Sequence, residues 1–124
     1  MWGVNKVVLV GHLGKDPEMR RLADNVSVVS FPLATSEQVN VDHNRLEETE
    51  WHNIIMWRSL ADAAHKFLKK GKLIYLEGKI RTRSFDDKQG IHRVITEILA
   101  ENFTILGRSS DFESADNVTY KNTD

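Results

Sequence analysis

Three cations and an aromatic ring alternate along one short segment of the chain, with a spacing typical of surfaces that bind nucleic acid. Lys79, Arg81, Arg83 and Phe85 occupy every second position. Because side chains alternate between the two faces of a β-strand, a strand here would project all four to one side, about 6–7 Å apart. Phosphates and base faces recur along a single nucleic-acid strand at similar intervals. The alternative is a solvated basic face that ends in an isolated ring.

The segment 50–57 is a second candidate surface. One face of a strand here would carry Trp51, Asn53, Ile55 and Trp57. The other face would carry Ile54 and Met56, so both faces are partly apolar. Burying the two indoles would also bury Asn53, which would then need a hydrogen-bond partner. Periodicity alone leaves both orientations of this strand open.

Charge is distributed unevenly, although the net charge is only −1. Residues 66–93 contain nine basic and three acidic side chains, whereas residues 37–50 contain five acidic and one basic. Such asymmetry is typical of a protein with one phosphate-facing surface, but solvated faces of opposite sign would give the same pattern.

Few residue types are available for catalysis or metal binding. The chain has no cysteine, which excludes disulfides, thiolate metal sites and a cysteine nucleophile. Its five histidines lack the spacing of a zinc site. Asp86 and Asp87 are adjacent acids that could hold a magnesium ion, but acids in a hairpin turn are usually solvated. We therefore expect a binding protein that has no enzymatic activity, metal or cofactor.

The order of elements predicts an all-β fold. Apolar and β-branched runs predict strands at 4–10, 26–35, 50–57, 72–85 and 92–106. An apolar stripe with Ser59 as its N-cap and Gly71 as its stop predicts one helix between the third and fourth strands. This is the layout of an OB-fold, a five-stranded Greek-key barrel. The polar segment 39–48 is expected to be a long loop, and residues 86–90 a hairpin turn.

The domain is expected to span residues 1–107, followed by a short disordered tail at 108–124. Within the fourth strand, Ile80 and Thr82 are expected to share the core face with Ile74 and Leu76. No apolar run approaches the roughly 18 residues of a membrane helix. The first residues also lack the apolar core of a secretory signal.

Seven segments in order resemble the bacterial single-stranded DNA-binding protein family. They are Gly3-Val4-Asn5-Lys6-Val7, Val10-Gly11-His12-Leu13-Gly14-Lys15-Asp16-Pro17-Glu18, Leu33-Ala34-Thr35-Ser36-Glu37, Thr49-Glu50-Trp51-His52, Leu68-Lys69-Lys70-Gly71, Tyr75-Leu76-Glu77-Gly78 and Arg81-Thr82-Arg83. The resemblance covers about residues 3–107. It implies sequence-independent binding and protection of single-stranded DNA during replication, recombination and repair. It also implies a cytoplasmic, nucleoid-associated homotetramer.

The resemblance implies a set of site residues and turns the two indoles outward. Its stacking aromatics fall on Trp51, Trp57 and Phe85. Its phosphate-contacting residues fall on Lys6, Arg20, Lys70, Arg81, Arg83 and Arg93. Arg58 and Lys79 join this set from their own faces and neighbours rather than from the resemblance.

The sequence departs from the family pattern at several points. Val39 stands where many members have a tryptophan, Phe85 replaces another, and Trp57 replaces a phenylalanine. The acidic tip ending in Pro-Phe, through which members recruit replication and repair proteins, is absent from these residues. Recruitment of such partners therefore does not follow from the resemblance. Two other functions remain open: a scaffold that uses the barrel to bind replication proteins, and an RNA-binding OB domain.

Overall fold

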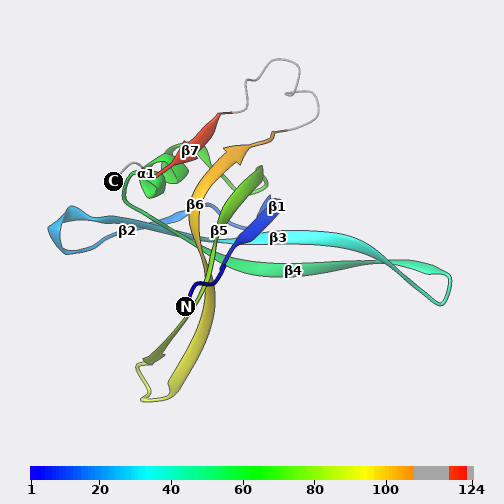
Figure 1. Cartoon of the computed structure of the whole chain (residues 1–124), viewed down its shortest axis with the longest axis horizontal. Helices are drawn as coiled ribbons and strands as arrows, with labels where there is room; N and C mark the ends of the chain where they lie inside the picture. Colours follow the sequence, from blue (N-terminus) through cyan, green and yellow to red (C-terminus); the bar gives the residue numbers. More distant parts are fainter. Residues whose placement is uncertain (108–117, 123–124) are drawn as a thin grey trace.

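Five strands close into a barrel in the computed structural model, which describes residues 1–107 and 118–122 (Figure 1). They are β1 (Val7–Leu13), β3 (Ser27–Val41), β4 (Asn44–Trp57), β5 (Leu73–Asp86) and β6 (His92–Ile105). β1 pairs with both β5 and β3, while β4 pairs with β3 and runs parallel to β6. This closed order, with one helix between the third and fourth barrel strands, confirms the predicted OB-fold.

The barrel interior is filled by the apolar face of each strand. Leu33, Ile54, Met56, Leu76 and Phe103 are all fully buried. Because Ile54 and Met56 point inward, the alternating residues of β4 point outward, as the resemblance implied for the two indoles.

Helix α1 (Arg58–Phe67) covers one end of the barrel and buries Leu60, Ala61 and Ala64. It begins slightly earlier than predicted and ends before Gly71. No helix in the described part of the chain is long and apolar enough to cross a membrane.

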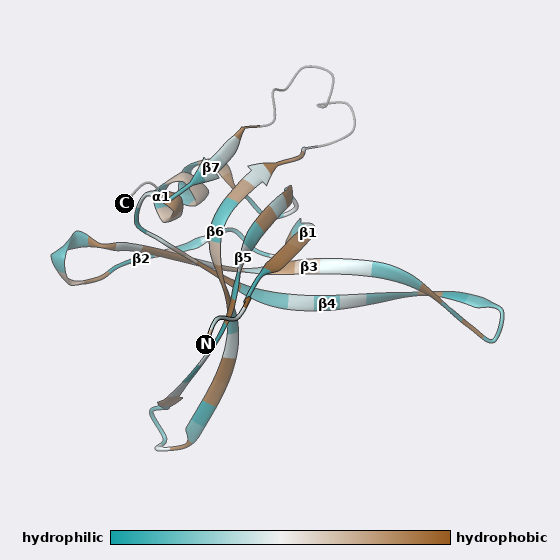
Figure 2. Ribbon diagram, viewed as in Figure 1, coloured by the Kyte–Doolittle hydropathy of each residue, from teal (hydrophilic) through white to brown (hydrophobic). Residues whose placement is uncertain are grey.

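The segment 39–48 was expected to be a loop, and that prediction is wrong. β3 and β4 continue through it as a regular hairpin, in which Ser36 pairs with Thr49 and, at the outer end, Val41 pairs with Asn44. This hairpin, here called the β3–β4 arm, projects far beyond the barrel (Figure 1). Asp42 and His43 form the turn with φ values of 50° and 66°. Two successive left-handed residues are typical of the tight turn that suits the twist of a hairpin. The outer part of this arm is mostly hydrophilic (Figure 2).

β5 and β6 form a second projecting arm, here called the β5–β6 arm, beyond a bulge at Glu77 and Gly78. A side chain at Gly78 would collide with the Leu99 carbonyl, so the close strand approach requires glycine. Past this point β5 carries exposed side chains on both faces, whereas Glu97 and Ile98 of β6 remain buried. The prediction that Ile80 and Thr82 lie on the core face is therefore wrong, since Ile80 is 49% exposed.

Two strands and a short 3-10 turn were not predicted. β2 (Glu18–Arg21) pairs with β3, and η1 (Ala23–Asn25) connects them. β7 (Thr119–Lys121) pairs with β6. The expected disorder at 108–124 therefore does not apply to β7, while residues 108–117 and 123–124 lie outside the described part of the chain.

Candidate nucleic-acid interface

A groove, here called the central groove, lies between the outward face of β4 and the β5–β6 arm. Its lining combines an indole, an aliphatic floor and three guanidinium groups: Trp57, Ile55, Arg20, Arg81 and Arg83. Beyond Arg20 and Arg83 the hollow continues toward Lys15, Asn53 and Ile95. β2, β4, β5 and β6 thus each contribute a wall, although their side chains are far apart in the sequence.

The acidic residue at the base of the central groove is Glu97, which is only 3% exposed. Its Oε1 accepts hydrogen bonds from Arg83 Nε at 3.0 Å and from Arg81 Nη2 at 3.4 Å. The Arg81 and Arg83 side chains nevertheless remain 39% and 46% exposed. One buried carboxylate therefore orients two cations without removing them from the solvent, and the cluster retains an excess of positive charge.

The outer end of the β5–β6 arm carries Phe85, which is 40% exposed. The Arg83 guanidinium lies 5.3 Å from the centre of this ring, and Arg93 is the cross-strand partner of Phe85. Arg93 Nε donates to Asp87 Oδ2 at 2.9 Å. This contact, together with the Ile91 and Gln89 backbone N–H groups, holds the pKa of Asp87 below its ordinary value.

Trp51 lies on the same outward face of β4 and is 59% exposed. Its ring covers Gly14 so closely that any side chain at that position would collide with the indole. The indole therefore rests on backbone and presents its other face to solvent. Trp51, Asn53, Ile55 and Trp57 occupy every second position of β4 toward the central groove.

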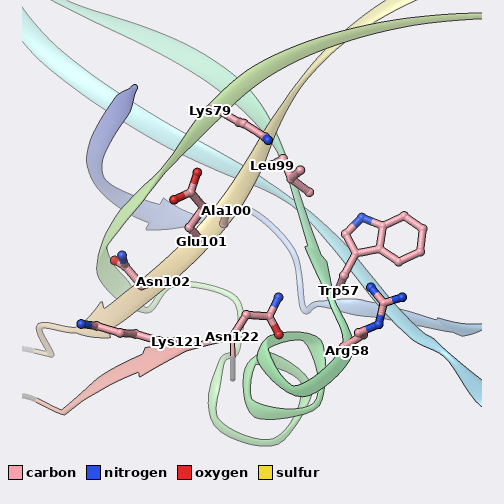
Figure 3. Close-up of a pocket in the computed structure, with 9 residues that line it drawn as sticks. All are labelled: Trp57, Arg58, Lys79, Leu99, Ala100, Glu101, Asn102, Lys121 and Asn122. Carbon is pink, nitrogen blue, oxygen red and sulfur yellow. The ribbon is translucent and has the colours of Figure 1, made fainter. Parts of the chain in front are cut away.

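A further hollow, here called the β7 groove, extends from Trp57 on the other side. Arg58 lies beside Trp57 and Lys79 lies across from them, while Lys121 lies toward the opposite end and Asn122 lies between Lys121 and Arg58 (Figure 3). The structure thus brings Arg58 and Lys79, which the resemblance does not supply, to the groove that Trp57 lines.

Lys6 and Lys70 line neither groove. Lys6 Nζ forms an ion pair with Glu77 Oε2 at 3.0 Å. The hydrogen bond and the charge attraction between Lys6 and Glu77 raise the pKa of Lys6. The same contact, together with a hydrogen bond from Asn102, lowers the pKa of Glu77. Lys70 borders a separate hollow beside His12, where its backbone N–H donates to Asp16 Oδ1 at 2.8 Å.

Sequence reasoning missed Glu97, Lys15, Lys121 and Asn122. An acid inside the apolar run 94–99 was a usable signal, because counting back from the hairpin turn pairs Glu97 with Arg81. Lys121 gave no such signal, since nothing apolar repeats around it. In the described part of the chain, no group of three or more histidine or acidic side chains could hold a metal ion.

The barrel and its aromatic, cationic groove define an OB-fold protein of the class that binds oligonucleotides or oligosaccharides. Within that class, the chain belongs to the single-strand binding protein family, whose sequence profile matches residues 4–106.

Individual relatives agree with this assignment. The chain is 45% identical over 120 residues to a "Single-stranded DNA-binding protein 1" of Chlorobaculum tepidum, covering 95% of this chain and 74% of the relative. It is 49% identical over 106 residues to a single-stranded DNA-binding protein of Neisseria meningitidis, covering 84% of this chain and 60% of that relative. A solved "Plasmodium falciparum SSB complex with ssDNA" superimposes with a TM-score of 0.74 at 29% identity, covering 80% of this chain and 88% of that one. The chain therefore spans between about three fifths and three quarters of these curated relatives.

Proposed function

We propose that this chain binds single-stranded DNA without sequence preference and protects exposed strands during replication, recombination and repair. The observation that carries the proposal is the central groove, in which the Trp57 indole lies among Arg20, Arg81 and Arg83. The likeness to a single-stranded DNA complex at a TM-score of 0.74 supports it. Every base has a π-face and every nucleotide a phosphate, so this combination tolerates any sequence.

The proposed roles divide between stacking and charge neutralisation. Bases stack on Trp51 and Trp57 of β4 and on Phe85 of the β5–β6 arm, because each of these rings is at least partly exposed to solvent. Phosphates are contacted by Arg20, Arg58, Lys79, Arg81, Arg83 and Arg93. Lys6 and Lys70 contact DNA only where the strand leaves the grooves and runs around the barrel.

We infer that the chain performs no chemistry on the strand, since its proposed contacts are rings and cations rather than acids, bases or nucleophiles. We also propose a homotetramer in the cytoplasm, associated with the nucleoid, on the basis of family membership. A native mass equal to four chains is the expected result, and a monomeric mass at micromolar concentration would contradict the assembly.

Titration with oligo-dT tests the binding proposal, because Trp51 and Trp57 report on their own stacking. We expect tryptophan emission to fall on addition of the oligonucleotide. The logarithm of the binding constant should decline against the logarithm of salt concentration by about 0.7 per phosphate neutralised. Unchanged emission and no binding at low salt would contradict the proposal. Competition by oligo-U of the same length would distinguish a preference for RNA.

A further inference from the structure

β7 is a fixed element of the domain, although it follows the barrel. Thr119, Tyr120 and Lys121 pair in register with Thr104, Phe103 and Asn102 of β6. The Tyr120 ring stacks on both Phe67 and Phe103, with ring centres 5.2 and 4.9 Å apart. These contacts anchor β7 to α1 and to the barrel core at once.

The residue after β7 holds the start of α1. Asn122 Oδ1 accepts a hydrogen bond from Ser59 Oγ at 3.0 Å and a longer one from the Leu60 backbone N–H at 3.4 Å. Ser59 directly follows Trp57 and Arg58, so this contact links β7 to the segment that carries the groove indole. The end of β7 is therefore held to the first turn of α1, two residues after Trp57.

Between these elements lies the β7 groove, with a volume of about 670 Å³. Its floor includes Leu99 and Ala100, and its charged lining residues are Arg58, Lys79, Lys121 and one acid, Glu101 (Figure 3). Trp57 lines this groove and the central groove alike, so the two hollows meet at the indole. The excess of cations and the partly apolar floor match the needs of a nucleotide: charge for its phosphate and an apolar surface for its base or sugar.

We infer that β7 is part of the DNA-binding surface, and that the strand continues from Trp57 through the β7 groove to Lys121, whose ammonium group neutralises a further phosphate. This inference rests on the proposed function and extends its site beyond the barrel. Lys121 is exposed and lies at the end of the groove opposite Trp57, so a strand that follows this groove away from the indole passes Lys121.

The test is a salt series of oligo-dT titrations with the full chain and three variants. In Lys121→Gln the charge is removed, and the slope of log K against log salt should become shallower by about 0.7, the contribution of one phosphate. Lys121→Arg keeps the charge and should keep the slope of the unaltered chain. Lys66→Gln is the matched control, because Lys66 is also an exposed lysine and lies on α1, where it lines neither groove. Its slope should not change.

Each outcome has a distinct meaning. An unchanged slope in Lys121→Gln, with normal binding by the unaltered chain, overturns the role of β7 and leaves the proposed function standing. Equal loss in Lys121→Gln and Lys66→Gln also overturns it, because the effect would then be one of net charge alone. Absence of oligo-dT binding by the unaltered chain overturns both proposals.

Discussion

Trp57 is the side chain at which the central groove and the β7 groove meet. It ends β4 and immediately precedes α1, so its position is fixed by the barrel on one side and by the helix on the other. Arg58 next to it adopts a left-handed conformation, with φ of 57°, where the chain turns from strand to helix. Backbone strain of this kind is often found at binding sites.

We expect Trp57→Ala to weaken oligo-dT binding by about 5- to 150-fold, since a stacked base contributes about 1–3 kcal/mol. Fluorescence anisotropy of a labelled oligonucleotide measures the change without relying on tryptophan emission. Trp2→Ala is the control, because Trp2 is 99% exposed and lines neither groove. Equal affinities for the two variants would contradict the role given to Trp57.

Glu97→Gln is expected to lower the free energy of unfolding by about 1–2 kcal/mol. The amide oxygen is a weaker acceptor for the two guanidinium groups, and their partial exposure limits the loss because water can solvate them. Urea denaturation measures the change. Glu101→Gln, an exposed position on the same strand, should stay within about 0.5 kcal/mol of the unaltered chain. A Glu97 variant as stable as the Glu101 variant would show that the shared carboxylate is not structural.

At the scale of elements, the sequence was most informative where one face of a segment is buried. The barrel strands and α1 show clear apolar periodicity, and all were predicted. The β3–β4 arm was missed because most of its side chains are polar, and its few apolar residues, Val39, Val41 and Leu46, do not form a clear alternating pattern. Ile80 was misplaced because periodicity cannot reveal that β5 leaves the barrel at Gly78.

The candidate site was predictable to the extent that it lies on single strands. The alternation of Arg81, Arg83 and Phe85 follows from one segment. The meeting of Arg20 with Trp57 requires the packing of β2 against β3, which no local pattern specifies. Glu97 was missed for a related reason, since its burial depends on a cross-strand pair of arginines.

β7 supplies the first prediction at this scale. Tyr120→Ala should lower the free energy of unfolding by about 2 kcal/mol, because its half-buried ring stacks on Phe67 and Phe103. Chemical denaturation monitored by far-UV circular dichroism gives the value. Val118→Ala, at an exposed position just before the strand, should have little effect. Equal stability of both variants would mean that β7 does not contribute to the fold.

The turn of the β5–β6 arm supplies the second prediction at this scale. The folded-state pKa of Asp87 is below the unfolded-state value, so its stabilisation of the turn is complete above the unfolded pKa and is lost only as pH falls through the folded pKa. We expect an NMR titration of the Asp87 carboxyl carbon to give a pKa below that of an ordinary aspartate. In Arg93→Gln this pKa should rise, because the principal hydrogen bond is lost. An unchanged pKa in the variant would contradict the assignment.

At the scale of the molecule, the two projecting arms differ in charge. The β5–β6 arm carries Arg81 and Arg83 of the central groove, whereas residues 37–50 of the β3–β4 arm contain five acids and one base. Val39 lies in this acidic arm, at a position where the resemblance places a stacking tryptophan in many family members. We therefore expect the strand to follow residues 51–57 of β4, the β5–β6 arm and the grooves rather than the acidic arm, since phosphates and carboxylates repel one another.

The central claim is that this surface recognises unpaired bases as well as phosphates. The most direct test compares the affinity for oligo-dT with that for a duplex of the same length at the same salt concentration, measured by anisotropy. Duplex bases are stacked on one another and unavailable to Trp51, Trp57 and Phe85. At about 1–3 kcal/mol per stacked base, we predict that the single strand binds at least about 100-fold more tightly. Equal affinity for the two forms would mean that the grooves attract phosphate charge alone, and it would contradict the account.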